Sequence, residues 1–97
     1  MKVIIKQSVI DQKIRKVVFL NLNIEMEFPP VIGMDFLTNA QTESKLHIPL
    51  IERVVYDIQT KIYTCFPVNY AYCVKENENF DIVVQRYVDA GFEKLNN

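Results

Sequence analysis

Hydrophobic and polar positions alternate most clearly between residues 14 and 28. In the second half of this segment the even positions, such as Leu22 and Ile24, are apolar, whereas odd positions such as Asn21 are polar. A period of two places all the apolar side chains on one face of a strand. Residues 14–28 are therefore predicted to form one long half-buried strand, or two strands bent near the middle.

The flanking segments predict a hairpin and a short strand. Residues 2–10 form a second apolar stretch, and the polar residues 11–13 would join it to the long strand as a hairpin. The Pro29–Pro30 pair ends the long strand, because proline has no N–H for a sheet ladder. Gly33 is expected to adopt a positive φ before a short strand over residues 34–37.

A second hairpin is predicted after residue 48. Residues 48–58 form an apolar strand, and the segment 57–61 resembles the hairpin sequence Asp-X-X-Thr-Gly, with lysine in place of glycine. In this register Asp57 faces Ile62 and Tyr56 faces Tyr63, an aromatic cross-strand pair that stabilises a sheet.

Two other segments complete the strand-rich part of the chain. Residues 38–47 are the longest polar stretch and are expected to be an exposed loop, either functional or a plain surface connection. Residues 69–75 are expected to form a further strand after Pro67.

The C-terminal part predicts a helix of about 16 residues over 80–95. Apolar residues recur there at the i, i+3, i+4 spacing of one helical face, and Asn79 is suited to cap the first turn. Gly91 would lie inside this helix. The side chains expected to face the sheet are Phe80, Val84, Val88 and Leu95, and those expected to face water are Arg86, Asp89 and Glu93.

Composition favours a sheet-dominated fold. The 97 residues include 12 Val and 11 Ile but only 3 Ala, and β-branched side chains suit strands better than helices. We expect one α+β domain over residues 1–97, in which a C-terminal helix packs on one face of an antiparallel, mostly meandering sheet of four to six strands. The alternative fold is a small half-open β-barrel plugged by the helix.

Charge and targeting signals exclude several classes of function. The net charge is −1 and the pI is about 5.8, so no bulk field attracts the chain to nucleic acid or to acidic membranes. No segment resembles a signal peptide or reaches the roughly 18–20 apolar residues of a membrane span. The chain is therefore expected to be cytoplasmic, with no membrane partner.

Metal, cofactor and catalytic signals are weak. His47, Cys65 and Cys73 are the only soft metal ligands, and they lack the short paired spacing of a zinc site. The two glycines give no phosphate-binding loop, so no cofactor is expected. Any histidine-dependent catalysis would have to use His47. A small enzyme using Asp35, His47 and a tyrosine is kept as one alternative function.

The N-terminal hairpin suggests a second alternative, a nucleic-acid-binding module. Residues 2–16 contain five basic side chains and one acid, Asp11, which gives a local charge of +4. Lysines also protect sheet edges from pairing with other chains, and we favour that explanation. The five basic residues are Lys2, Lys6, Lys13, Arg15 and Lys16.

The main functional hypothesis comes from the face of the sheet that the predicted helix does not cover. One helix covers one face of a sheet of about five strands, so apolar residues on the other face need another partner. The chain is therefore predicted to be a non-catalytic interaction module or small subunit that forms a homodimer or binds a protein partner. The predicted interface consists of Val17, Phe19, Val55, Tyr63, Tyr70 and Tyr72.

Overall fold

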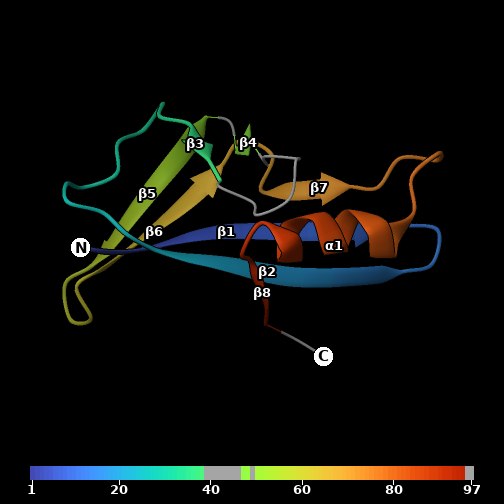
Figure 1. Ribbon diagram of the computed structural model, residues 1–97, viewed down its shortest axis with the longest axis horizontal. Coiled ribbons are helices and arrows are strands. Elements are labelled where there is room, and N and C mark those ends of the chain that lie inside the picture. Colours follow the sequence, from blue (N-terminus) through green and yellow to red (C-terminus); the bar gives the residue numbers. More distant parts are fainter. Residues whose placement is uncertain (39–46, 49, 96–97) are drawn as a thin grey trace.

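The computed structural model describes residues 1–38, 47–48 and 50–95. Most of the polar stretch 38–47 therefore lies outside the described residues. The elements are β1 (Lys2–Asp11), β2 (Lys16–Glu25), β3 (Phe36–Leu37), β4 (His47–Ile48), β5 (Ile51–Asp57), β6 (Ile62–Pro67), β7 (Ala71–Cys73), α1 (Phe80–Asp89) and β8 (Glu93–Lys94) (Figure 1).

A six-stranded sheet forms the centre of the molecule. Its strand order is β5-β6-β1-β2-β8, and β7 also pairs with β1. The predicted N-terminal hairpin is confirmed, because β1 and β2 pair antiparallel from Lys2 opposite Glu25 to Asp11 opposite Lys16. The second hairpin is also confirmed, with Tyr56 opposite Tyr63 in the β5–β6 pair.

The sheet is mixed, so the prediction of an antiparallel meander is wrong. Both β6 and β7 run parallel to β1, with Val3 opposite Tyr63 and Val9 opposite Tyr72. After β2 the chain crosses to the far edge of the sheet, enters it as β5 and returns as β6 beside β1. The sheet is not closed into a barrel, which also excludes the alternative fold.

β6 and β7 together occupy one side of β1, and two buried polar residues fill the break between them. Gln7 Nε2 donates to the carbonyl oxygens of Asn69 and Tyr70, at 2.7 and 3.2 Å. The backbone N–H and the hydroxyl of Ser8 also donate to Tyr70 O, at 2.7 and 3.0 Å. These bonds satisfy the polar side chains of Gln7 and Ser8, which are 4% and 2% exposed.

The helix is shorter than predicted, because Gly91 ends it. Gly91 has a φ of +107°, and its N–H donates to Val88 O while the N–H of Phe92 donates to Tyr87 O. This pair of bonds is a Schellman motif, which requires a left-handed residue after the last turn. The rings of Tyr87 and Phe92 also meet edge to face, with centroids 5.4 Å apart.

The early end of the helix changes where the last residues point. Asn79 caps the N-terminus as expected, since its side chain accepts a bond from the N–H of Ile82. Val84 is buried and Val88 is half-buried, as predicted. Leu95, in contrast, is 52% exposed, because the chain beyond Phe92 runs along β2 as β8 rather than continuing the helical face.

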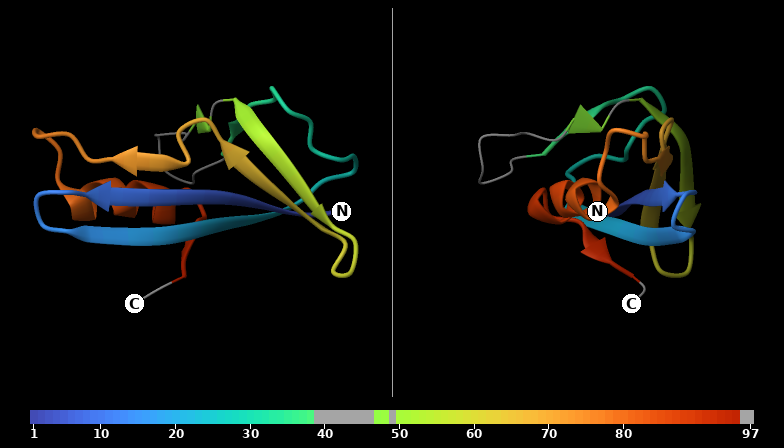
Figure 2. Two further views of the ribbon diagram at one scale, coloured as in Figure 1. Left: turned by 180° about the vertical axis from the view of Figure 1, so that it is seen from behind. Right: turned by 90° about the vertical axis from the view of Figure 1, so that its right-hand side faces the viewer.

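The core lies between the sheet and α1, which packs over β1 and β2 (Figure 2). None of the described helices is long and apolar enough to cross a membrane. The buried core residues are Val3, Ile5, Val9, Val18, Leu20, Leu22, Ile48, Ile51, Cys65, Val83, Val84 and Phe92.

Candidate functional site

One face of the sheet is not covered by α1. Side chains alternate between the two faces of a strand, so Val17 and Phe19 lie on the face opposite the buried Val18 and Leu20. The view from behind turns this face toward the reader, with α1 beyond β1 and β2 (Figure 2, left). We call this surface the open face.

Three of the predicted interface residues lie on the open face. Val17 is 43% exposed, Phe19 is 44% exposed and Val55 is 38% exposed. Val55 belongs to this face because it pairs with Thr64, which in turn pairs with Ile4 of β1. Two strands of the sheet, β2 and β5, thus leave apolar side chains in solvent on one side.

Two of the predicted tyrosines lie on the opposite face. Tyr63 is opposite Val3 and Tyr72 is opposite Val9, and both pack against the core. Tyr63 pairs with Tyr56 whereas Val55 pairs with Thr64, so the hairpin register itself places Tyr63 and Val55 on opposite faces of the sheet. Tyr70 precedes β7 and remains 38% exposed.

A groove of about 290 Å³ runs across the open face. Phe66 and Tyr70 form one side, with their rings edge to face at 5.4 Å, and Phe19 and Leu95 also contribute. Asn21 lies in the groove, and its Oδ1 is buried with no hydrogen-bond partner among the described residues. The lining residues are Lys6, Gln7, Phe19, Leu20, Asn21, Phe66, Tyr70 and Leu95.

The groove was missed in the sequence because it depends on long-range pairing. Phe66 reaches it through the parallel pairing of β6 with β1, and Leu95 reaches it because the Leu95 N–H donates to Phe19 O at 2.9 Å. Next to the groove, the Arg53 guanidinium lies 5.6 Å from the centroid of the Phe66 ring. This contact between a cation and an aromatic face holds Arg53 over the open face.

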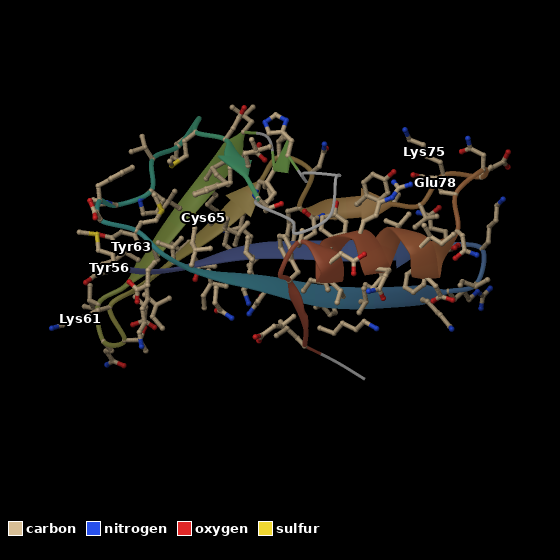
Figure 3. The ribbon with its side chains drawn as sticks, in the orientation of Figure 1. Tyr56, Lys61, Tyr63, Cys65, Lys75 and Glu78 are labelled. Atoms are coloured by element: carbon tan, nitrogen blue, oxygen red, sulfur yellow. The ribbon has the colours of Figure 1, made fainter. Side chains whose placement is uncertain are left out.

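The β5–β6 hairpin sets the positions of the residues at the far end of the open face. Its turn is closed by Asp57, whose Oδ1 accepts bonds from the N–H groups of Thr60 and Gln59. These bonds lower the pKa of Asp57. Across the hairpin the rings of Tyr56 and Tyr63 lie side by side on the face that carries α1 (Figure 3).

The residues of the enzyme hypothesis are also brought together. His47 Nε2 lies 3.0 Å from Asp35 Oδ2, and Asp35 Oδ1 accepts a bond from the Leu50 N–H at 2.6 Å. The bond from Leu50, followed by that from His47, lowers the pKa of Asp35. Asp35 thus joins β4 and the start of β5 to the segment before β3.

His47 also borders a cavity of about 220 Å³ on the side of the sheet that carries α1. Tyr72 donates its hydroxyl to both oxygens of Glu78, at 2.6 and 2.8 Å, and this bond raises the pKa of Tyr72 to about 12. Glu78 also accepts the Lys75 N–H, and both residues lie near the start of α1 (Figure 3). The lining residues are Gln7, His47, Ile48, Pro67, Asn69, Tyr72 and Tyr87.

The side chains of Gln7, His47 and Tyr72, which line this cavity, already have hydrogen-bond partners. Gln7 bonds carbonyl oxygens, Tyr72 bonds Glu78 and His47 bonds Asp35. Among the described residues that line the cavity, none is a serine or cysteine that could act as a nucleophile. The arrangement could bind a small polar group or exchange a proton with it through His47.

The basic residues of the N-terminal hairpin are spread along its length. Lys2 and Lys6 lie on β1, whereas Lys13 and Arg15 lie in the turn at the other end. Lys13 Nζ is 3.9 Å from a carboxylate oxygen of Glu76. Nucleic-acid binding by this hairpin stays a prediction.

The two cysteines are separated by the topology. Cys65 pairs with Ile5 and Cys73 pairs with Ile10, so they contact different parts of β1. Burial raises the pKa of the Cys65 thiol to about 11. Within the described part of the chain, no group of three His, Cys, Asp or Glu side chains is placed to hold a metal ion.

Comparison with known proteins adds no further information on this surface. No protein-family model matches the chain, and neither a curated protein nor a solved structure matches it at a significant level.

Proposed function

We propose that the protein is a non-catalytic interaction module that self-associates through the open face of its sheet. The observation that carries the proposal is the exposure of Val17, Phe19 and Val55 on the face that α1 leaves uncovered. Large contiguous apolar surfaces on soluble proteins mark interaction sites. A second copy of the chain is the partner that this surface fits, because a two-fold axis lets one apolar patch cover itself.

The groove supplies the centre of such a contact. Aromatic side chains are enriched among the residues that dominate binding energy, and the groove places Phe19, Phe66 and Tyr70 around Lys6 and Asn21. Burial of Phe19 against a second copy would remove its exposed ring from water. The rim of the groove has charged side chains such as Arg53, as interface rims do.

Replacing Phe19 with lysine tests this proposal. Phe19→Lys adds a charge to the open face, where it would be buried in an assembly but hydrated in a monomer. We expect the variant to lower the association constant at least about tenfold while its Tm stays within a few degrees. Ile58→Lys is the matched control, because Ile58 is 80% exposed at the tip of the β5–β6 hairpin. Equal association of both variants and the unchanged protein would reject the open face.

A second candidate function rests on the pairing of His47 with Asp35 beside the 220 Å³ cavity. A histidine oriented by a carboxylate can act as a general base. This candidate ranks lower because both side chains are about half exposed and the described lining residues include no serine or cysteine. It predicts that turnover of a generic p-nitrophenyl ester or phosphate is lost in His47→Ala with an unchanged Tm. Equal rates for both proteins would reject it.

A further inference from the structure

The outer edge of β5 is the starting point for a more specific inference. β5 is the first strand of the sheet order, so its neighbour on one side is β6 and its other side is an edge. Among the described residues, the backbone bonded to this edge is the Gly33–Met34 segment, which exchanges two hydrogen bonds with Ile51. The edge beyond Ile51 carries backbone groups able to pair with another strand.

The hairpin turn shows which residues face this edge. The carbonyl oxygen of Asp57 accepts the Lys61 N–H at 2.7 Å, so the backbone of Asp57 points toward β6. From Arg53 to Asp57 backbone direction alternates as in a regular antiparallel strand, because the irregularity in β5 lies between Ile51 and Arg53. Arg53 and Val55 therefore also point toward β6, whereas Val54 and Tyr56 point their N–H and C=O groups toward the free edge.

This alternation allows three antiparallel pairings of β5 with a second β5. An edge-facing residue must meet an edge-facing residue, so the two-fold axis can pass through Val54, Val55 or Tyr56. An axis at Val54 places Arg53 opposite Val55, and an axis at Tyr56 places Asp57 opposite Val55. With Val55 on the axis, Arg53 lies opposite Asp57 at both ends of the pairing.

We propose that two copies of the chain pair antiparallel along β5, with Val55 on the two-fold axis. In this register Val54 of each copy exchanges two backbone hydrogen bonds with Tyr56 of the other, giving four in all. Val55 meets its symmetry mate, and Arg53 meets Asp57, on the open face. These last pairs are the non-hydrogen-bonded kind, whose side chains come closest together.

The shape of the molecule permits this approach. The β5–β6 hairpin lies at one end of the molecule, away from α1 (Figure 1). Strand pairing over five residues is a small interface, so a weak association is expected from the edge alone. The proposed β5 pairing rests on the proposed function for the premise that the partner is a second copy of the chain. The pairing would join two open faces into one continuous surface, and Phe19 on β2 takes no part in it.

Disulfide trapping tests the register. Val55→Cys places two thiols across the axis, within the Cα separation of about 4.4–6.8 Å that a disulfide needs. The variant is made with Cys73→Ser, because Cys73 is the exposed cysteine. Oxidation by glutathione disulfide should yield mainly a species of twice 11.4 kDa. Failure of Val55→Cys to cross-link at millimolar concentration would overturn the proposal.

Arg53→Cys in the same background is the matched control. Arg53 is exposed on the same face, but in the proposed register its two copies are offset by four residues, roughly 13 Å along the strand. We expect at least about tenfold slower cross-linking than for Val55→Cys, since that separation exceeds the reach of a disulfide. Equal or faster cross-linking of Arg53→Cys would overturn the register.

Amide hydrogen exchange tests the pairing without any substitution. The proposal expects exchange at Val54 and Tyr56 to slow several-fold as protein concentration rises from about 10 μM to about 1 mM, because pairing occupies these donors. Exchange that is independent of concentration at both amides would overturn it.

Adding Phe19→Lys to the Val55→Cys variant separates the two proposals. If the variant with both substitutions still cross-links, the edge pairing is supported, even if the open face does not associate. Association of the parent chain that Phe19→Lys abolishes, with no Val55→Cys cross-link, supports the open face and rejects the edge pairing.

Discussion

The rings of Tyr56 and Tyr63 lie 4.4 Å apart between centroids, across the β5–β6 hairpin. They meet because Asp57 pairs with Ile62 one position nearer the turn. An aromatic pair of this kind contributes about 0.5–1.5 kcal/mol beyond the area it buries. The same turn forces Lys61 into a left-handed conformation, with a φ of +61°. One hairpin therefore contains both a favourable contribution, from the aromatic pair, and a strained one, at Lys61.

Lys61→Gly is expected to stabilise the protein. A left-handed conformation costs an L-residue about 1–2 kcal/mol, and the extra freedom of glycine in the unfolded chain offsets about 0.4–1 kcal/mol of the gain. We expect the free energy of unfolding to rise by about 0.5–1 kcal/mol in chemical denaturation. Gln59→Gly is the control, since Gln59 lacks a positive φ and its substitution should not stabilise. A loss of stability in Lys61→Gly would contradict the turn geometry.

Gly91→Ala should destabilise the protein more than Gly33→Ala. Both glycines have a positive φ, +107° and +94° respectively, so both substitutions introduce strain of about 1–2 kcal/mol. At Gly91 an added Cβ would also lie 3.3 Å from Leu22 Cδ1, whereas nothing lies within 4 Å at Gly33. Thermal unfolding of the two variants measures the difference. A Gly91→Ala variant as stable as the parent would show that this residue does not end the helix as described.

Val84→Asp is expected to cost several kcal/mol, because the aspartate would be buried without a partner. Val84 is 5% exposed on the sheet side of α1, whereas Ile82 on the same helix is 58% exposed. Ile82→Asp is therefore the matched control, expected to change stability by less than about 1 kcal/mol. Circular dichroism of both variants provides the measurement, and similar Tm values for the two would contradict the packing of α1.

Acid stability should depend on the contact between Tyr72 and Glu78. The Tyr72 hydroxyl and the Lys75 N–H lower the pKa of Glu78 from its ordinary value of 4.5. A carboxylate with a lowered pKa in the folded state stabilises the protein above the unfolded value and loses that contribution as pH falls through the folded one. Tyr72→Phe removes the hydroxyl, which is the larger of the two causes of the lowered Glu78 pKa. The variant should therefore lose less stability than the parent as the pH falls from about 5 to about 2.

Denaturation midpoints across that pH range test the contact, with Tyr70→Phe as the control. Tyr70 packs against Phe66, and its substitution should leave the acid dependence unchanged. Parallel acid profiles for Tyr72→Phe and the parent would show that Glu78 gains no stabilisation from Tyr72.

Local features of the fold were predictable from the sequence because short-range chemistry determines them. The Asp57 turn fixed the register of Tyr56 and Tyr63, and alternation in the second half of β2 identified Leu22 as buried. The end of the helix was predictable in principle. Gly91 followed by an aromatic residue is the Schellman pattern, but the continued apolar spacing to Leu95 outweighed it.

Long-range pairing was not predictable in the same way. The residues of β6 do not determine by themselves whether the neighbouring strand runs parallel or antiparallel to it. The direction depends on where the chain re-enters the sheet after the 25 residues between β2 and β5. That choice placed Tyr72 opposite Val9 of β1 and brought Phe66 and Phe19 to one groove. The pairing of Asp35 with His47 likewise depends on how β3 meets β4.

Sedimentation equilibrium of the unchanged protein tests self-association most directly. The account predicts a mass that rises with concentration and reaches at least twice 11.4 kDa at high micromolar concentration. A mass that stays at 11.4 kDa over the whole range would contradict self-association by either the open face or the β5 edge.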